Sequence, residues 1–368
     1  MSDPRYTPLR TRHEALGASF TDFGGWQMPV RYTSDLAEHH AVRDAAGIFD
    51  ISHMAEFTVR GADASAFLDH ALAGRLSALA VGKAKYSLLL AETGGIIDDV
   101  IVYRLEDDDF LVISNAGNRD AVREAFGART GSFDVVVADV SDEYALIAVQ
   151  GPQAAAIVAA TAGISDVSIP WDEQKYYAWA SASFRDRPLL LARTGYTGED
   201  GFELLVAADD AADLWDAVLT AGAPHGLVPA GLAARDTLRL EAGMPLYGHE
   251  LTLDTKPVQA GLGRVVVAAK ESFVGKDGLD TAPDAPVLVG LVAEGKRAGR
   301  AGYSVVDADG AVLGEITSGA LSPTLGHPIA MAYVTPSSAA EGTAVFLDVR
   351  GTSIPATVTA LPFYRRTK

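Results

Sequence analysis

Residues 86–114 read YSLLLAETGGIIDDVIVYRLEDDDFLVIS, and this stretch decides the fold. It contains three apolar runs, which are separated by the glycine-containing turn Glu92–Gly95 and the acidic turn Asp107–Asp109. The runs are Tyr86–Leu90, Ile96–Leu105 and Phe110–Ser114. Short apolar runs interrupted by turn residues are typical of strands connected by hairpins. The spacing therefore predicts a β-meander.

Strand and helix patterns surround this meander. Strands are expected at Ala55–Arg60 and Asp134–Val140, and helices at Ala62–Leu72 and Asn118–Phe126. This mixture predicts a compact α+β unit. The remaining expected helices are Ser34–Ala46, with Ser34 as N-cap, 151–162, Asp210–Leu219 and Gly231–Ala242. The remaining expected strands of this part are Tyr144–Val149, Pro188–Arg193 and Phe202–Val206.

The pattern changes after Gly263, where helical periodicity becomes scarce. Asp277–Pro286 is an expected linker, and short β segments follow it. They are Val287–Val292, Tyr303–Val306, Met331–Val334, Val345–Val349 and Ala356–Thr359. The C-terminal third is therefore predicted to be an all-β module.

Composition limits the classes of function. The chain has 48 acidic and 30 basic residues, and its formal net charge of −18 repels phosphate backbones, so we expect no nucleic-acid partner. It has no cysteine, which excludes disulfides, thiolate nucleophiles and cysteine metal sites. No apolar run approaches the roughly 18 residues that span a bilayer, and Met1–Pro4 lacks the layout of a secretory signal. We therefore expect a cytoplasmic protein with no membrane segment.

The common cofactor motifs are missing. Gly82-Lys83 and Gly275-Lys276 lack the upstream glycine and the following Ser or Thr of a phosphate-binding loop. The histidines are scattered, and no Gly-x-Ser-x-Gly elbow is present. We therefore expect neither a bound metal nor a nucleotide cofactor.

Asp98 and Asp99 interrupt an apolar strand. Because side chains alternate along a strand, Asp99 is expected to share a face with Ile101 and Tyr103, while Asp98 faces the other way. A buried carboxylate is costly unless it is hydrogen-bonded or neutralised. Two interpretations stay open: both aspartates cap the preceding Gly94-Gly95 turn, or one lies in a cavity where it handles protons or binds an N–H-rich ligand.

Residues 193–203 read RTGYTGEDGFE, with three glycines at three-residue spacing before the apolar strand that contains Glu203. This pattern is compatible with a hairpin that carries Glu203 on an edge strand. It is equally compatible with a carboxylate that faces a planar heterocycle, because two oxygens on one carboxylate suit adjacent amino and ring N–H donors.

The expected helix Gly231–Ala242 carries Arg235 and Arg239, which are four residues apart and so share a face. They could form an exposed ladder of ion pairs. Alternatively, the leucines around them indicate partial burial, and a buried arginine needs an anion from the protein or from a ligand.

Short segments along nearly the whole chain together resemble the glycine cleavage T-protein family, whose members are also called aminomethyltransferases. The segments are Thr7–Leu9, Asp22–Trp26, Phe49–Met54, Lys85–Ser87, Gly94–Asp99, Val149–Pro152, Arg193–Glu203, Ala234–Glu241, Thr317–Gly326 and Pro362-Phe363. One such segment would be weak, but their joint order is highly specific.

The resemblance implies an α+β fold, a three-domain cloverleaf with antiparallel sheets around a central folate site. Residues 1–52 and 140–262 would form a discontinuous α+β domain with the folate-binding loop. Residues 53–139 would form a ferredoxin-like α+β domain that carries Asp99, and residues 263–368 a C-terminal β-barrel or jelly-roll domain.

The resemblance also implies an activity. The lipoylated H-protein would present an aminomethyl group, and the one-carbon unit would pass to the co-substrate tetrahydrofolate with release of ammonia and formation of 5,10-methylenetetrahydrofolate. No metal is implied. The H-protein would be a partner, in a transient complex with the other glycine cleavage proteins.

The family's catalytic aspartate corresponds to Asp99. Its substrate- and folate-binding positions correspond to Met54, Tyr86, Tyr103, Val112, Asn115, Tyr196, Glu203, Arg235 and Arg300. Strand alternation had independently placed Asp99 and Tyr103 on one face.

This sequence departs from the family at Ala233, Lys256 and Arg264, where Gly, Ser or Thr, and Trp are usual. These departures concern the lipoyl path and domain contacts rather than the folate site. Two other functions of the same fold remain alternatives: a folate-dependent demethylase, and a non-catalytic folate-binding assembly factor. Relatives of the second kind use a cysteine-containing signature, which this chain lacks.

Overall fold

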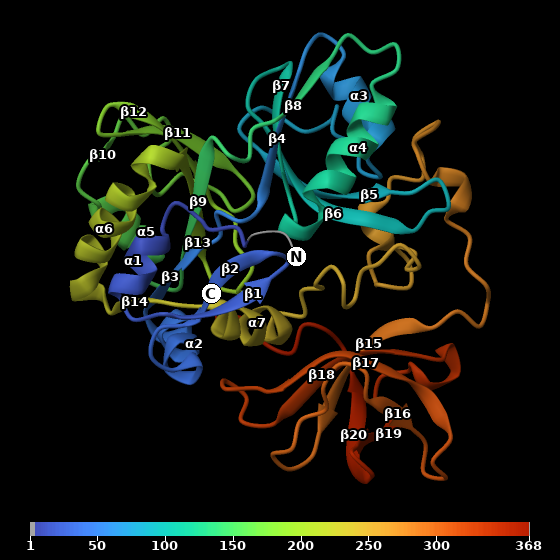
Figure 1. Cartoon of the computed structure of the whole chain (residues 1–368). Coiled ribbons are helices and arrows are strands. Elements are labelled where there is room, and N and C mark those ends of the chain that lie inside the picture. Colours follow the sequence, from blue (N-terminus) through green and yellow to red (C-terminus); the bar gives the residue numbers. More distant parts are fainter. Residues whose placement is uncertain (1–3, 368) are drawn as a thin grey trace. The chain divides into compact units, whose positions relative to one another are not determined.

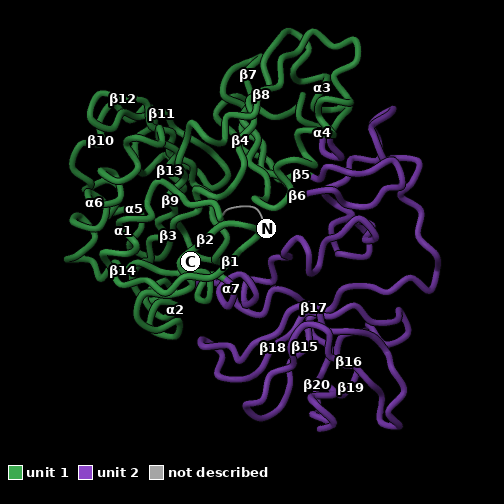
Figure 2. Tube along the Cα trace, in the orientation of Figure 1, with its two compact units in different colours: residues 1–71, 75–87, 99–235 green, residues 72–74, 88–98, 236–368 purple. Residues whose placement is uncertain are grey.

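A computed structural model describes residues 4–367 of the chain. Residues 1–3 lie outside the described residues. They belong to Met1–Pro4, the segment for which the sequence predicts no secretory signal. The chain divides into two compact units (Figure 2). Unit 1 comprises residues 1–71, 75–87 and 99–235, and unit 2 comprises residues 72–74, 88–98 and 236–368. The division into three domains remains a prediction.

Unit 1 contains a seven-stranded sheet in the order β10-β11-β12-β13-β9-β3-β14 (Figure 1). Its strands are β3 Ala46–Asp50, β9 Tyr144–Gln150, β10 Ile164–Ser165, β11 Trp179–Phe184, β12 Arg187–Ala192, β13 Gly201–Ala207 and β14 Leu227–Pro229. Neighbouring strands are antiparallel except β14, which runs parallel to β3. The helices of this region are α1 Arg10–Ala15, α2 Asp35–Asp44, α5 Ala154–Ala160 and α6 Ala211–Gly222.

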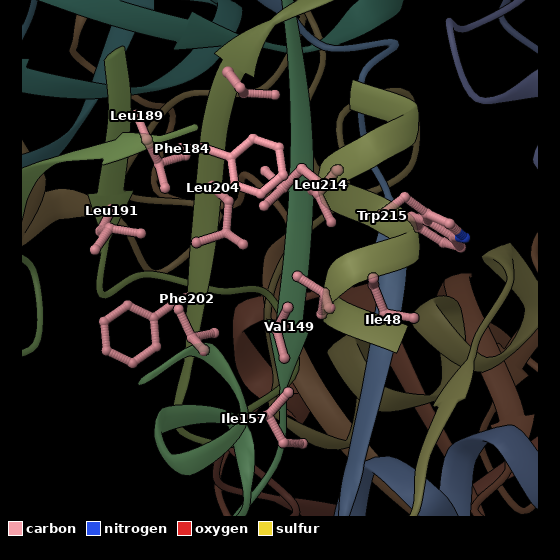
Figure 3. Packing of buried hydrophobic residues seen from close by; sticks show 14 of the residues in the cluster. Ile48, Val149, Ile157, Phe184, Leu189, Leu191, Phe202, Leu204, Leu214 and Trp215 are labelled. Atoms are coloured by element: carbon pink, nitrogen blue, oxygen red, sulfur yellow. The ribbon is translucent and has the colours of Figure 1, made fainter. Parts of the chain in front are cut away.

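One continuous apolar cluster joins this sheet to α5 and α6. Figure 3 shows Trp215 and Leu214 of α6 and Ile157 of α5 beside side chains of the strands, including Val149 and Leu204. All five are fully buried. Removing a large buried side chain typically costs several kcal/mol, so this cluster fixes the position of β13 and of the residues it carries.

The predicted meander is confirmed in a second, five-stranded sheet in the order β5-β6-β7-β4-β8. Its strands are β4 Ala55–Arg60, β5 Ala84–Leu90, β6 Ile96–Arg104, β7 Asp109–Ser114 and β8 Val136–Asp139. The helices α3 (Ala64–Ala71) and α4 (Arg119–Arg129) cover one face, where Phe126 of α4 packs on Phe57 and Phe67 with ring centroids 5.9 Å apart.

Strand β6 alternates as predicted. Ile97, Asp99 and Ile101 are partly exposed, whereas Asp98 and its neighbours of the same parity are buried. Register with β7 pairs Ile101 with Ile113, so Asp99 lies on the face opposite to the one that the helices cover.

The N-terminal region holds strands that the sequence did not predict. β1 Ser19–Phe23 and β2 Trp26–Arg31 form a hairpin. The predicted N-cap is confirmed, because the Ser34 hydroxyl accepts from the Ala37 amide at 3.4 Å. However, α2 ends at Asp44 rather than Ala46, since Ala46 already begins the buried strand β3.

Unit 2 contains a closed six-stranded barrel in the order β15-β18-β17-β16-β19-β20. Its strands are β15 Val287–Ala293, β16 Ser304–Val306, β17 Val312–Leu321, β18 Pro328–Val334, β19 Ala344–Val349 and β20 Thr352–Thr359. Their inward side chains form a separate apolar core that includes Leu291, Ile316 and Val358. The predicted class, α+β with antiparallel sheets and a C-terminal barrel, is confirmed.

No helix within residues 4–367 is long and apolar enough to cross a bilayer.

The helix α7 (Leu232–Glu241) contains the last residues of unit 1 and the first of unit 2. It confirms the helix predicted over Gly231–Ala242.

Candidate functional site

Asp99 is held by hydrogen bonds on both carboxylate oxygens. Tyr86 Oη of β5 donates to Oδ2 at 3.0 Å, and Asn115 Nδ2, just beyond β7, donates to Oδ1 at 2.8 Å. Burial raises the pKa of Asp99, although these two hydrogen bonds oppose the rise. Burial, with the charge of Asp99, also raises the pKa of Tyr86, so its phenol stays a donor. The aspartate is therefore oriented and biased toward accepting a proton.

Glu203 forms a second polar cluster in unit 1. Thr194 Oγ1 donates to Glu203 Oε2 at 2.5 Å, and Tyr103 Oη lies 3.0 Å from Thr194 Oγ1. Burial raises the pKa of Glu203, and Thr194, Arg235 and Tyr103 oppose that rise. The interpretation of Glu203 as an edge-strand residue is wrong, because β13 lies between β12 and β9.

The neighbours of Glu203 in the sheet are small. Register pairs it with Ala192 on β12 and with Ala148 on β9. Directly opposed residues on adjacent strands point to the same face. The carboxylate therefore lies between two small side chains, Ala192 and Ala148, on one face of the sheet.

Arg235 belongs to the same cluster. Its guanidinium carbon lies 5.0 Å from the centroid of the Tyr196 ring, a cation–π distance. Burial lowers the pKa of Arg235, while the charge of Glu203 opposes that change. Its Nη1 is buried and has no hydrogen-bond partner among the described residues. A buried unsatisfied donor is expensive, and an acceptor from a ligand would satisfy it.

The Arg193–Glu203 loop is anchored from two sides. Arg43 of α2 donates to the Thr197 carbonyl at 2.8 Å and to Glu199 Oε1 at 2.9 Å. Gln150 at the end of β9 donates to the Thr194 carbonyl at 3.0 Å. These buried contacts hold the loop in one conformation.

Two of the loop glycines are required by this anchoring. A Cβ on Gly195 would lie 2.0 Å from Gln150 Oε1, and one on Gly201 would lie 2.4 Å from Gln150 Nε2. The glycine spacing noted in the sequence therefore serves close packing on one glutamine side chain.

Tyr177 was not predicted from the sequence. Burial raises its pKa, and the charges of Tyr176, Glu203 and Asp99 add to the rise. Its φ of +57° is in the left-handed region, which bulky residues rarely adopt and which tends to occur at functional sites. No pattern of residue types predicts a positive φ at a tyrosine, so no signal in the sequence would have identified Tyr177.

The side chain of one predicted position, Val112, lies on the face of the sheet opposite to Asp99. Val112 is fully buried on the helix-covered face, in register with Val102 and Phe57, whereas its neighbour Ile113 lies on the face of Asp99. Met54 is partly exposed in the turn before β4. Arg300 belongs to unit 2, where its Nη1 donates to the Gly319 carbonyl at 3.2 Å.

The second arginine of α7 has its own partners. Arg239 is 2% exposed, and its Nη1 donates to Glu250 Oε2 at 3.0 Å while its Nε donates to Asp236 Oδ1 at 2.8 Å. The exposed-ladder interpretation is therefore wrong, and the anion for Arg239 comes from the protein. Within residues 4–367, no group of three or more His, Asp or Glu side chains could hold a metal ion.

Comparisons with known proteins agree along the whole chain. The GCVT N-terminal domain matches residues 9–270, and the glycine cleavage T-protein C-terminal barrel domain matches residues 287–365. The aminomethyltransferase of Cutibacterium acnes is 57% identical, and that of Streptomyces avermitilis is 54% identical. The alignments cover 100% and 99% of this chain, respectively, and equal shares of the two relatives.

A solved structure has the same fold. The crystal structure of glycine cleavage system aminomethyltransferase T from Bartonella henselae is 37% identical, with a TM-score of 0.90 and 99% of each chain covered. Sequence and fold thus agree over the full length, and the chain belongs to the glycine cleavage T-protein family of aminomethyltransferases.

Proposed function

We infer that this protein is the tetrahydrofolate-dependent aminomethyltransferase of a glycine cleavage system. It takes the aminomethyl group from the lipoyl arm of the H-protein, passes the one-carbon unit to tetrahydrofolate and releases ammonia. The observation that carries this inference is that Asp99 has both oxygens held by Tyr86 and Asn115. Full-length similarity to aminomethyltransferases supports it.

Glu203 is the proposed acceptor for the pterin edge of the folate. That edge carries amino and ring N–H donors, which a carboxylate accepts well. The two residues that flank Glu203 in the sheet are alanines, which carry no polar group to compete for the carboxylate. Tyr103 is linked to the same carboxylate through Thr194.

Arg235 is proposed to bind an acceptor group of the folate toward its tail. Its Nη1 is buried without a partner among the described residues, and a ligand oxygen would supply one. The Tyr196 ring under the guanidinium fixes its plane. A planar, permanently charged donor is well suited to oxygen acceptors.

Asp99 is the proposed catalytic residue. Transfer requires a folate nitrogen to attack an iminium-like carbon that leaves the lipoyl sulfur. Asp99 orients that nitrogen. As the new bond forms, Asp99 accepts the proton of the nitrogen or stabilises the positive charge that develops on it. Its raised pKa suits this role, because a carboxylate closer to neutral pH is a better proton acceptor.

The other predicted positions complete the proposed site. Tyr86 and Asn115 hold Asp99, and Met54, Val112 and Arg300 stay proposed contacts from the family resemblance. The H-protein is the proposed carrier partner, and the cytoplasm the proposed compartment.

The direct test is ammonia release from aminomethylated H-protein, with and without tetrahydrofolate. We expect rapid, stoichiometric release only when tetrahydrofolate is present, together with 5,10-methylenetetrahydrofolate. Release of a methyl group from a methylated donor instead would favour a demethylase. Folate binding without turnover of either donor would favour an assembly factor.

A further inference from the structure

Three hydroxyl and carboxyl groups form a buried chain beside β13. Tyr103 is 2% exposed, Thr194 is 1% exposed and Glu203 is 8% exposed. Thr194 Oγ1 stands between the other two, 3.0 Å from Tyr103 Oη and 2.5 Å from Glu203 Oε2. Tyr103 is 91 residues from Thr194 in sequence, so only the fold brings it to the other two.

The direction of this chain follows from counting protons. A threonine hydroxyl has one proton, and Thr194 gives it to Glu203. The contact with Tyr103 must then be one in which the phenol donates and Thr194 accepts. Burial raises the pKa of Tyr103, so its phenol keeps the proton that this direction needs. The chain therefore runs from Tyr103 through Thr194 to Glu203.

This direction fixes which oxygen of Glu203 meets a ligand. Oε2 accepts from Thr194, and Oε1 is available to accept a hydrogen bond from a ligand. The hydrogen bond from Thr194 also favours the ionised form of Glu203, which burial alone would disfavour. Thr194 thus affects both the orientation and the charge of the group proposed to meet the pterin.

We propose that Thr194 is a positioning residue for folate binding, which holds Glu203 Oε2 and directs Oε1 toward the donor edge of the pterin. This inference rests on the proposed function. The backbone of Thr194 does the anchoring of the loop through Gln150, so the hydroxyl is not needed for that task.

The loop provides a matched control. Thr197 is also fully buried, and its hydroxyl donates to Gln150 Oε1 at 2.9 Å rather than to Glu203. Thr194→Val and Thr197→Val each remove one buried hydroxyl from the same loop while keeping the side-chain shape. Only the first removes a hydrogen bond to the carboxylate.

The experiment measures the dissociation constant of tetrahydrofolate against pH by calorimetry, with the unfolding temperature recorded for each variant. We expect Thr194→Val to weaken binding by at least about tenfold at neutral pH. Because the pKa of Glu203 rises without this hydrogen bond, affinity should start to fall at a higher pH than in the wild type. Thr194→Ser should restore both values, and Thr197→Val should leave the pH midpoint unchanged.

Tyr103→Phe tests the order of the chain. Alone it should weaken binding, and combined with Thr194→Val it should cost less than the sum of the two single losses, because part of its effect passes through Thr194 while Tyr103 also acts on Glu203 directly. If Thr194→Val fails to fold, Thr194→Ala and the Tyr103→Phe variant carry the same measurement.

The results separate two failures. Wild-type affinity and pH midpoint in Thr194→Val, with affinity lost in Glu203→Gln, would overturn the role of Thr194 and leave the folate placement standing. An equal shift of the pH midpoint in Thr197→Val would also overturn it, as a general loop effect. Unchanged affinity in both Thr194→Val and Glu203→Gln would refute the placement of folate on Glu203.

Discussion

Asn115 Nδ2 donates to Asp99 Oδ1 at 2.8 Å and also approaches the Asp99 carbonyl oxygen at 3.3 Å. The Asn115 amide thus contacts both the side chain and the backbone of Asp99. Asn115 lies one residue beyond β7, and Asp99 lies on the neighbouring strand β6. This contact keeps the carboxylate from turning back to cap its own turn, and it supports the proposed catalytic role of Asp99.

Asp99→Asn should separate binding from catalysis. The substitution keeps the shape and one acceptor oxygen but removes the negative charge that is proposed to assist nitrogen attack. We expect tetrahydrofolate affinity within about tenfold of the wild type, and turnover lower by at least about a hundredfold. Calorimetry gives the first quantity, and the ammonia-release assay gives the second.

Asp98→Asn is the matched control for that variant, because Asp98 is buried on the other face of β6. It should reduce turnover much less than Asp99→Asn. A loss as large as that of Asp99→Asn would mean that the catalytic assignment is wrong. Full activity in both variants would leave the pair as turn residues and end the proposed mechanism.

Glu203→Ala should weaken tetrahydrofolate binding by at least about 1.5 kcal/mol, a typical loss for a hydrogen bond to a charged group. The physical reason is that the pterin donors would lose their buried acceptor. Glu143→Ala, at an exposed position outside the sheet, is the calorimetric control and should bind as the wild type does. Equal affinity in the two variants would contradict the placement.

Alternation along β6 could be predicted from the sequence because the rule is local and strictly periodic. It correctly placed Asp99 and Tyr103 on one face, and the meander followed from turn residues alone. The resemblance suggested Val112, yet the register puts the Val112 side chain on the face opposite to Asp99. By alternation, the residue of β7 that shares the face of Asp99 is Ile113.

Other features depend on contacts that no local pattern encodes. β17 was missed because Gly314 and Gly319 interrupt its alternation; a Cβ on Gly314 would lie 1.9 Å from the Tyr333 carbonyl oxygen of β18. Tyr103 reaches Thr194 only because strand β6 and the loop before β13, which are distant in sequence, pack together. Long-range contacts of this kind determine the arrangement around Glu203.

Chelation should leave turnover unchanged. Within residues 4–367, no group of three or more His, Asp or Glu side chains could hold a metal ion. The sequence also lacks cysteine and the spaced histidines of zinc sites. The measurement is the ammonia-release rate after dialysis against EDTA. Loss of activity that a divalent metal restores would contradict this expectation.

Asp50 should make folding stability fall in acid. Burial alone would raise its pKa, but hydrogen bonds with His13 at 2.8 Å, Thr7 at 2.5 Å and the Ser52 amide at 2.9 Å reverse the effect and lower the pKa. A carboxyl with a lowered folded-state pKa stabilises the fold above its ordinary value of 3.8. That stability is lost as pH falls through the folded-state value.

Urea unfolding across the acid range tests this expectation. The free energy of unfolding of the wild type should decrease below about pH 4. Asp50→Asn should be less stable at neutral pH and should show a smaller decrease on acidification. Parallel pH curves for the two proteins would show that another carboxylate causes the acid transition.

Glu56 should act in the opposite direction. It is 1% exposed on β4, and neither carboxyl oxygen has a hydrogen-bond partner among the described residues. Burial raises its pKa well above 4.5; Arg119 opposes the rise, and Asp139 and Asp142 add to it.

Because the folded state keeps a proton that the unfolded chain releases, Glu56 penalises folding increasingly as pH rises from about 4.5 toward the folded-state pKa. Glu56→Gln has no proton to lose and should therefore be more stable than the wild type at neutral pH, with the difference vanishing near pH 4. Exposed Glu143→Gln is the control and should follow the wild type throughout. A Glu56→Gln variant that is less stable than the wild type at neutral pH would contradict this expectation.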